Sequence, residues 1–399
     1  MKNKLRVLCL DTEGGFGGSS RSLYLSILYL LRIDINIHID VWCKKQGPIQ
    51  NKYRDLGISV NVFPNMPKIR SVPLFTRNIF LMGKFFLIDW RRSKKFRKNM
   101  LLEVNNYDIV HCNHESLYWL ARWISVKSDT LVAMHIRTNP WPSIFTRFQI
   151  SVIDKYVNNL VFITENEKKT YVDSCGSEDK GVVIYNIVES ATIAGISKLD
   201  AFDDDCFKVC VLSNYAYLRG TDRLAKVSNI IYESTGKTDI LFVIAGKKIL
   251  TKTMPGDLGN IAKNGGDLSD YIEKHGIGSM FLFLDHVTNP ESVLSACNVL
   301  IRPSREYNPW GRDVLEALSF GVPVIATGKY NRFVKDGATG FLLDEFDSKT
   351  VAKHIIELSK NKEIVKNMGK QGRQRVEELC NGPDRAQDLF QFWQKIVEG

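Results

Sequence analysis

The chain lacks any long uninterrupted apolar run, any low-complexity tract and any obvious internal repeat. The short apolar run near its N-terminus, in MKNKLRVLCLDTEGG, is too short for a signal-peptide core, and no small-residue cleavage site follows it. The apolar part of residues 74–98 is broken by Arg77 and Lys84, so it is not a membrane-spanning helix of about 20 residues. These absences favour a cytoplasmic protein.

Paired cysteines are missing as well. Cys206 and Cys210 have neither zinc-like spacing nor a second pair. Most cysteines lie inside apolar runs, namely Cys9, Cys112, Cys210 and Cys297. This pattern fits buried thiols in a reducing cytoplasm better than a disulfide framework.

Acids are scarce in one stretch of a chain whose net charge is +10. Residues 68–98 hold ten Lys/Arg and one acid, Asp89, with aromatic and aliphatic residues between them. Two interpretations stay open: a surface that lies on an anionic membrane, on the inner face of the cytoplasmic membrane, or a helix pair with a solvated basic face. Nucleic acid is not expected, because no nucleic-acid motif accompanies the charge. The candidate acceptor or membrane surface comprises Lys84, Arg91, Arg92, Lys94 and Lys95.

Apolar runs alternate with helical patterns along both halves of the chain, which predicts parallel sheets covered by helices on both faces. The expected strands of the first half are 5–11, 35–43, 58–64, 107–113, 130–136, 159–164 and 181–188. Those of the second half are 207–213, 239–246, 280–287, 298–304 and 322–328, with helices at 221–234, 290–297, 313–320 and 348–360.

The fold class predicted from this alternation is α/β, with two Rossmann-like, doubly wound domains that face each other across a cleft, the expected ligand site. At 399 residues the chain is long enough for two large cores. The expected domains are 1–190 and 206–385. Residues 191–205 are weakly patterned and read as a linker, and 386–399 is expected to be a helix that packs back toward the first domain.

A glycine-rich loop, GGFGGS at 14–19, follows the first strand and opens a helix. It fails the dinucleotide fingerprint, because Ser20 and Arg21 stand where the last glycine is needed. Trp42 and Cys43 likewise occupy the place of a ribose-binding acid, which disfavours a dehydrogenase. The loop could approach a phosphate, or it could be a plain strand–helix turn.

Two further segments place cations before helices. Arg219 and Gly220 precede a predicted helix, where a cation and a helix N-terminus suit a diphosphate, although an exposed arginine near a turn explains them equally well. The segment 302–328, RPSREYNPWGRDVLEALSFGVPVIATG, reads as a strand, a turn, a loop with Gly311, a helix with Glu316 and a second short strand.

This segment resembles the GT-B glycosyltransferases, specifically the large retaining family 4 type, the glycosyl transferases group 1. The family pattern PS-x-x-E-x-F-G-x-x-x-x-E-A is followed by G-x-P-V-x-A and later by D-G-x-x-G-x-L. GGFGGSSRSLYL, YDIVHCN, LVAMHIR, FITENEKK and LRGTDRL are similar to further family segments, so the resemblance extends over nearly the whole chain. The matching residues are Pro303, Ser304, Gly311, Glu316, Ala317, Gly321, Pro323, Val324, Ala326, Asp336, Gly337, Gly340 and Leu342.

The resemblance implies a nucleotide-diphosphate sugar as co-substrate, no other cofactor and no metal. It implies that Glu316 binds the ribose, that Arg219 neutralises the departing diphosphate, and that Gly17 and Gly18 touch the phosphates from the first domain. His135 maps to a family histidine near the reacting sugar, although without the family it reads as a strand-end histidine satisfied locally.

The chain departs from the family pattern at two positions. Asn308 stands where the family has its first motif Glu, and Asn214 stands where it has a phosphate-loop Arg. Arg312 is an extra cation, which we expect to take over phosphate neutralisation. Gly311 and Asp313 complete the expected donor loop, with Asp313 also readable as a structural partner of the helix N-terminus.

The function that the resemblance implies is retaining sugar transfer to a glycan or lipid-linked acceptor, in bacterial surface polysaccharide, lipopolysaccharide or glycolipid synthesis. The acceptor hydroxyl would attack from the face of the leaving phosphate, whose oxygen takes the proton. Two alternatives stay open: a transferase-like binding protein that has lost catalysis, which Asn308 and Asn214 favour, and another nucleotide-sugar enzyme on the same fold.

Overall fold

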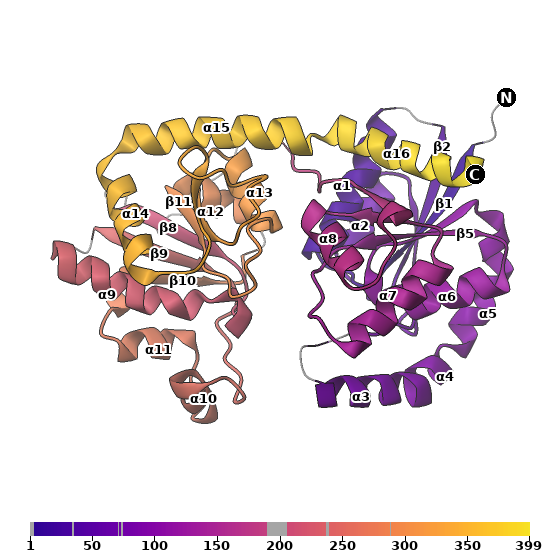
Figure 1. Cartoon of the computed structure of the whole chain (residues 1–399), viewed down its shortest axis with the longest axis horizontal. Coiled ribbons are helices and arrows are strands. Elements are labelled where there is room, and N and C mark those ends of the chain that lie inside the picture. Colours follow the sequence, from indigo (N-terminus) through magenta and orange to yellow (C-terminus); the bar gives the residue numbers. More distant parts are fainter. Residues whose placement is uncertain are drawn as a thin grey trace. The chain divides into compact units, whose positions relative to one another are not determined.

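The computed structural model describes residues 4–33, 36–70, 72, 75–189, 206–236, 239–287 and 289–399. The chain divides into two compact units (Figure 1). The first comprises Met1–Ile187 and Gly382–Gly399, and the second comprises Val188–Asn381. The expected linker at 191–205 lies outside the described residues.

The first unit is built on a seven-stranded, all-parallel sheet in the order β3-β2-β1-β4-β5-β6-β7. Its strands are β1 (Leu5–Asp11), β2 (Ile37–Cys43), β3 (Ser59–Val62), β4 (Ile109–Cys112), β5 (Leu131–Ile136), β6 (Asn159–Phe162) and β7 (Gly181–Val183). Its α-helices are α1 (Gly18–Arg32), α2 (Ile49–Asp55), α3 (Phe75–Lys84), α4 (Trp90–Arg92), α5 (Lys94–Glu103), α6 (Tyr118–Lys127), α7 (Ile144–Tyr156), α8 (Glu165–Asp173) and α16 (Gly382–Glu398). A π-helical segment, η1 (Phe85–Asp89), joins α3 to α4.

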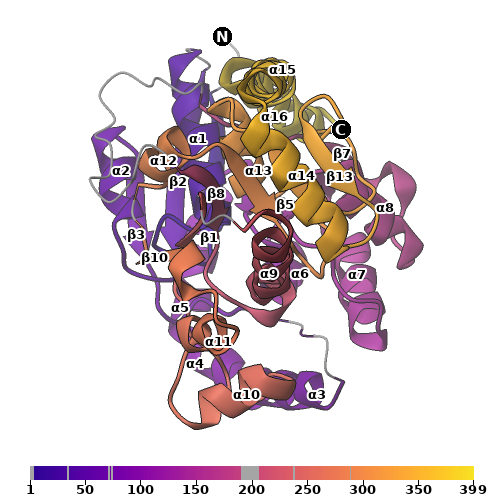
Figure 2. The same cartoon turned by 90° about the vertical axis from the view of Figure 1, so that its left-hand side faces the viewer.

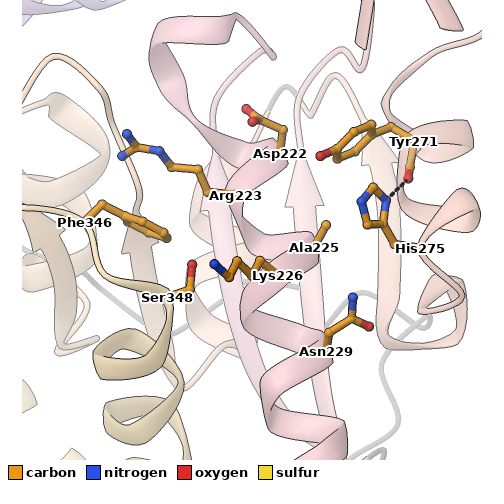
Figure 3. A pocket seen from close by; sticks show the side chains of 9 residues that line it. All are labelled: Asp222, Arg223, Ala225, Lys226, Asn229, Tyr271, His275, Phe346 and Ser348. Carbon is orange, nitrogen blue, oxygen red and sulfur yellow. Dashed lines mark hydrogen bonds between the residues drawn. The ribbon is translucent and has the colours of Figure 1, made fainter. Parts of the chain in front are cut away.

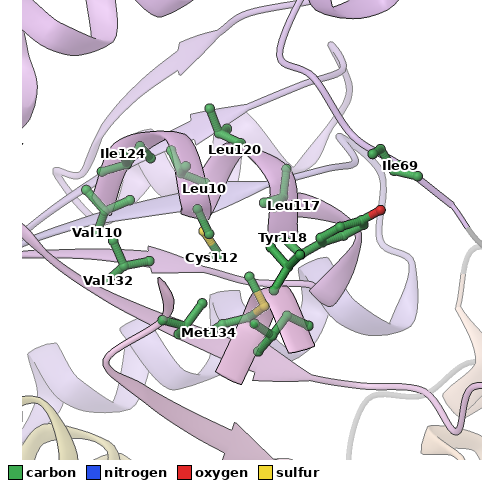
Figure 4. Packing of buried hydrophobic residues seen from close by; sticks show 14 of the residues in the cluster. Leu10, Ile69, Val110, Cys112, Leu117, Tyr118, Leu120, Ile124, Val132 and Met134 are labelled. Carbon is green, nitrogen blue, oxygen red and sulfur yellow. The ribbon is translucent and has the colours of Figure 1, made fainter. Parts of the chain in front are cut away.

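Alternate side chains of each strand enter two separate cores, one on each face of the sheet. Leu10 and Val110 pack with Leu120 of α6 on one face, as Figure 4 shows. Val7 and Val41 pack with helices α1 and α16 on the other face. Because both faces are covered, the strands read as almost continuous apolar runs, which is why the sequence located them.

The last helix, α16, packs on α1 within the first unit. A Cβ at Gly382 would lie 2.2 Å from the Tyr29 ring, so only glycine lets the helix begin this close to α1. Trp393 is fully buried in the core on that side of the sheet.

The second unit holds a six-stranded, all-parallel sheet in the order β10-β9-β8-β11-β12-β13. Its strands are β8 (Phe207–Leu212), β9 (Ile240–Ala245), β10 (Phe281–Asp285), β11 (Val299–Arg302), β12 (Val324–Thr327) and β13 (Gly340–Leu343). Its α-helices are α9 (Leu224–Thr235), α10 (Gly256–Lys263), α11 (Leu268–Lys274), α12 (Pro290–Ala296), α13 (Arg312–Ser319), α14 (Ser348–Lys360) and α15 (Lys362–Cys380). Helix α14 contacts α9, and α15 contacts α13 (Figure 2).

The structure differs from the expected elements in three places. The run 181–188 is a strand only as far as Val183. The Ile184 amide still donates to the Phe162 carbonyl at 2.9 Å, and Ile184 and Ile187 are buried. The helix expected from 221 begins as a 3₁₀ turn, η6 (Thr221–Arg223), before α9. Strand β13 and helices α10, α11 and α15 were not predicted as elements.

The expected buried thiols Cys9, Cys112, Cys210 and Cys297 are buried, and none of them forms a disulfide.

Candidate functional site

The loop after β8 is held against the loop after β11. Gly220 has φ +76°, and a Cβ there would lie 2.0 Å from the Pro303 carbonyl oxygen, so glycine is required on both counts. The Arg305 amide donates to the Leu218 carbonyl at 2.8 Å, and the Arg305 guanidinium binds both carboxylate oxygens of Asp222 at 2.8 and 2.6 Å. The two strand-end loops that carry the candidate residues therefore form one support.

Arg219, at the end of the 3₁₀ turn η5 (Tyr217–Arg219), is the most accessible of the candidate cations in this unit, with 39% of its side chain exposed. Its guanidinium lies 3.8 Å from the Glu306 carboxylate. Partial burial, and then the charge of Arg302, lower the pKa of Arg219. The charge of Arg302 next to Arg219 favours an anion here, whereas the carboxylates of Asp313 and Glu306 act in the opposite direction.

Arg302, the last residue of β11, is buried and organises the loop that follows. Its Nη1 donates to both oxygens of Asp313 at 2.6 and 2.5 Å, and its Nε donates to the Asn308 carbonyl oxygen at 2.8 Å. Its Nη2 donates to Oδ1 of the Asn308 side chain at 3.0 Å. Asp313 therefore neutralises a buried arginine inside the protein.

Asn308 links two charged neighbours. While its Oδ1 accepts from Arg302, its Nδ2 donates to the Glu306 carboxylate at 3.3 Å. A carboxylate at position 308 could not make that second contact, because it has no donor and would repel Glu306. The amide at the expected Glu position thus brings the Glu306 carboxylate toward Arg219.

The start of α13 is crowded at Gly311 and charged at Arg312. A Cβ at Gly311 would lie 2.4 Å from Arg302 Nη1 and 2.3 Å from Asp313 Oδ1, so a larger residue would displace that pair. Arg312 donates from Nε to Glu316 Oε1 at 3.1 Å, and its Nη2 lies 3.0 Å from the same oxygen. Each of the three acids of this segment, at positions 306, 313 and 316, therefore faces an arginine.

In the first unit, Gly17 and Gly18 are exposed at the N-terminus of α1. Gly17 caps the helix without a side-chain hydrogen bond, and a Cβ there would meet nothing within 4 Å. The glycine that the backbone needs is Gly14, whose Cβ would lie 2.2 Å from the Lys45 carbonyl oxygen. The exposed Gly17 and Gly18 thus stand at a helix start, the place where a phosphate contact is expected.

His135 lies near the carboxyl end of β5 and is one of three buried side chains in a row. His111 Nε2 lies 2.6 Å from His135 Nδ1, and Trp393 Nε1 lies 3.0 Å from His111 Nδ1. Burial, followed by the charges of Arg137 and His111, lowers the pKa of His135 well below its usual value. His135 is therefore neutral at pH 7, and its hydrogen-bond partner is His111 of the neighbouring strand β4, not a residue of its own loop.

Several polar residues at the ends of β4 and β5 were not predicted as functional. Arg137 donates to the Asn113 carbonyl and side-chain oxygens at 2.8 and 2.6 Å and to the Asn186 side chain at 3.1 Å. The Arg137 amide donates to Glu115 at 3.0 Å. The signal for these residues was their place just after parallel strands, where ligands of such sheets bind.

The basic stretch forms part of a cavity of about 380 Å³ in the first unit. Lys84 and Arg92 line it and are exposed, whereas Arg91, Lys94 and Lys95 do not line it. Burial, and then the charge of Lys68, lower the pKa of Lys44 in the same cavity. The full lining is Lys44, Pro64, Asn65, Met66, Pro67, Lys68, Ile69, Arg70, Leu81, Lys84, Phe85, Asp89 and Arg92.

The second unit has a larger cavity, of about 510 Å³, between α9, α11 and the start of α14 (Figure 3). Arg223 and Phe346 lie on one side of it, with the guanidinium carbon 4.7 Å from the ring centroid, and Tyr271 and His275 lie on the other. None of the predicted donor residues lines this cavity, so we do not assign the donor to it.

Known proteins share both the fold and part of the sequence. The structure is similar to that of Anabaena HepE in complex with UDP and glucose, with a TM-score of 0.72 and 15% identity over 98% of this chain and 100% of that one. It is also similar to Staphylococcus aureus TarM, with a TM-score of 0.70 and 11% identity over 99% and 100% of the two chains. These likenesses confirm the predicted GT-B fold.

Residues 197–375 match the sequence model of the glycosyl transferases group 1. It is 32% identical over 142 residues to the S. aureus capsular polysaccharide biosynthesis glycosyltransferase CapM, which is 34% of this chain and 37% of CapM. It is 34% identical over 99 residues to the Bacillus anthracis N-acetyl-alpha-D-glucosaminyl L-malate synthase, which is 24% and 26% of the two chains. The matched segments thus span about a third and a quarter of these curated relatives.

Within the described ranges, no helix is long and apolar enough to cross a membrane. The same residues contain no group of three or more His, Cys, Asp or Glu side chains placed to hold a metal ion.

The buried pair of Arg302 and Asp313 leads to a first prediction. Replacing Asp313 by Asn leaves a buried guanidinium without its counter-charge, so we expect the second unit to lose about 3 kcal/mol of unfolding free energy. Urea unfolding measures this loss. Asp344→Asn is the control, because Asp344 and Lys329 form an exposed pair in the same unit and should matter little. Equal effects of the two substitutions would show that Arg302 does not depend on Asp313.

Proposed function

We propose that the protein is a retaining, metal-independent glycosyltransferase of the family 4 type. It transfers a sugar from a nucleotide-diphosphate sugar to a glycan or lipid-linked acceptor in bacterial surface polysaccharide or glycolipid synthesis. The observation that carries the proposal is the ion pair of Arg219 with Glu306, in the loop that leads to α13, within a segment that matches the glycosyl transferases group 1.

In this proposal Arg219 neutralises the diphosphate, Glu316 binds the ribose and Gly311 keeps the helix start compact. Asn308 positions Glu306 and makes a hydrogen bond where the family has a carboxylate. Catalysis comes from placing positive charge around the leaving group, whose oxygen takes the proton of the acceptor hydroxyl. HepE and TarM have each been solved with UDP, so UDP-sugars are the first donors to test.

The first unit is proposed to bind the acceptor, and its basic cavity favours an acceptor that carries a phosphate on a lipid. Arg70, Lys84 and Arg92 line the cavity and are exposed. Phe80 of α3 is 78% exposed and Leu87 of η1 is 63% exposed, on the same helical segments as the lining residues. Cations beside exposed apolar side chains match the headgroup and chain of an anionic lipid.

A transferase-like binding protein without catalysis is the second candidate. Both departures from the family pattern have structural partners, since Asn214 accepts from the Lys247 amide at 2.8 Å and Asn308 accepts from Arg302. These contacts show that the two amides are used by the fold, as they would be in a protein that only binds a nucleotide.

Turnover of donor separates the two candidates. We predict that the purified protein releases UDP from a UDP-sugar, also in EDTA, and that Glu316→Gln raises the donor KM about tenfold because one charge-assisted hydrogen bond to the ribose is weakened. A coupled assay for the free nucleotide measures both. Nucleotide binding by thermal shift without any release, over a panel of UDP-, GDP- and ADP-sugars, would support the binding protein.

Arg312 is the subject of a second kinetic prediction. Replacing it by Ala should raise the donor KM or lower kcat about tenfold. The substitution removes a cation at the helix N-terminus, next to the Glu316 carboxylate that is proposed to bind the ribose. Arg312→Ala combined with Glu316→Gln shows whether Arg312 acts through Glu316, since the effects are then not additive. Kinetics unchanged by Arg312→Ala would remove this residue from the donor site.

The basic cavity predicts selective binding to phosphate-bearing vesicles. We expect the protein to co-sediment with phosphatidylcholine vesicles that contain phosphatidic acid and not with phosphatidylcholine alone. The double variant K84A/R92A should bind at least about tenfold more weakly than K94A/K95A, because only the first pair lines the cavity, and each cation near an anionic surface contributes about 1 kcal/mol. Equal losses would indicate general surface attraction instead.

A further inference from the structure

A buried hydrogen-bonded row in the first unit begins on the last helix and ends near the carboxyl end of β5. Trp393 of α16 is fully buried, as is His111 of β4, and His135 of β5 is only 5% exposed. The contacts are 3.0 Å from Trp393 Nε1 to His111 Nδ1 and 2.6 Å from His111 Nε2 to His135 Nδ1. The rings of each pair meet edge to face, with centroids 5.4 and 4.8 Å apart.

The chemistry of the first member decides where every proton lies. An indole nitrogen can only donate, so Nδ1 of His111 must accept from Trp393 and carries no proton. A neutral imidazole has one proton, which for His111 must then be on Nε2. That proton is donated to Nδ1 of His135, so the single proton of His135 is on its own Nε2.

The reverse arrangement is excluded by the same contacts. If His135 donated from Nδ1, then His111 Nε2 would accept, and the proton of His111 would be on Nδ1. Two N–H groups would then face each other over the 3.0 Å between Trp393 and His111 inside the core. Each buried donor left without an acceptor costs about 1–3 kcal/mol, so this arrangement of protons is strongly disfavoured.

Neither imidazole is charged at neutral pH, so each ring carries one proton, as the assignment of the protons assumes. Burial, and then the positive charge of Arg137, lowers the pKa of His111 to about 3, and the same causes lower that of His135. In the described contacts, no carboxylate makes a hydrogen bond to either ring that would favour a charged imidazole. The positive charge of Arg137, the residue directly after β5, disfavours one.

We infer that Trp393 is a positioning residue for the candidate site: acting through His111, it fixes His135 in the tautomer that carries its proton on Nε2. His135 then presents a hydrogen-bond donor and not a base. Such a donor suits a hydroxyl or ring oxygen of a sugar. This last step rests on the proposed function, whereas the tautomer itself does not.

The row also gives the last helix a role beyond packing. Trp393 and His111 are 282 residues apart in the chain, and the indole reaches the ring because α16 is packed on α1. The close approach at Gly382 to Tyr29 sets where that helix begins. The end of the chain therefore determines a proton position on β5, in the unit proposed to bind the acceptor.

The tautomer can be observed directly in the ligand-free full chain. Long-range nitrogen–proton NMR spectra of protein labelled with ¹⁵N-histidine distinguish a protonated from an unprotonated ring nitrogen. We expect both His111 and His135 to show protonated Nε2 and unprotonated Nδ1 from pH 6 to pH 8. His111→Gln and His135→Gln, each removing one set of signals, assign the spectra. A protonated Nδ1 on either ring, or titration of either ring in this range, would overturn the inference.

Trp393→Phe tests the role of the indole N–H, and Phe392→Leu is the matched control. Both positions are buried aromatics on α16, but only Trp393 donates to His111. We expect Trp393→Phe to produce a second set of histidine signals with protonated Nδ1, and Phe392→Leu to leave the tautomers as they are. Unchanged tautomers in a folded Trp393→Phe protein would contradict the inference, and if that variant does not fold, the wild-type spectrum decides alone.

Kinetics then connect the tautomer to transfer. Once sugar transfer has been measured, Trp393→Phe should lower kcat about tenfold, the effect of one lost hydrogen bond, with a smaller change in donor KM. Phe392→Leu should change kcat less. Absence of any transfer in the wild type would contradict the proposed function only, because the NMR result stands without a substrate. A tautomer change with unaltered kcat would show that His135 does not serve the reaction.

Discussion

The buried guanidinium of Arg302 is the group on which the candidate donor site depends. It ends β11, binds Asp313 at the start of α13 and holds both the carbonyl and the side chain of Asn308. A buried cation is tolerated only when it is paired and hydrogen-bonded, so the loop after β11 must take the path that brings these partners to it. Gly311 follows from the same demand, because any side chain there would occupy the space of the pair.

That arrangement explains the chemistry of the neighbouring residues. Because Asn308 is tied to Arg302, its amide nitrogen can bind Glu306, and Glu306 comes to face Arg219. Asn308 stands where the family has a carboxylate, and its amide positions a different carboxylate, that of Glu306. In the first unit the corresponding role belongs to a neutral row, in which the indole of Trp393 orders two imidazoles without adding charge.

The strands could be predicted because each buried parallel strand is an apolar run, and the pattern of residues 303–342 identified the fold. The side-chain contacts of the candidate residues could not be predicted from the sequence. Asp313 was expected in the donor loop or as a structural partner of the helix N-terminus, and its carboxylate binds Arg302. Arg312 was expected to neutralise a phosphate, and its guanidinium binds Glu316. Arg312 and Glu316 are four residues apart on one helix, a spacing that allows a pair but does not show that it forms. Arg305 and Asp222 are 83 residues apart, and sequence spacing gives no signal for their contact.

What the sequence determined by itself was local: the period of apolar residues, the glycines at helix starts and the order of family motifs along the chain. These features need only the chemistry of neighbouring residues. Only the tertiary structure decided which groups share a proton or a counter-charge. Trp393 and His111 are 282 positions apart, and nothing in either segment indicates the other. The physical reason is that a hydrogen bond forms over about 3 Å of space and is independent of distance along the chain.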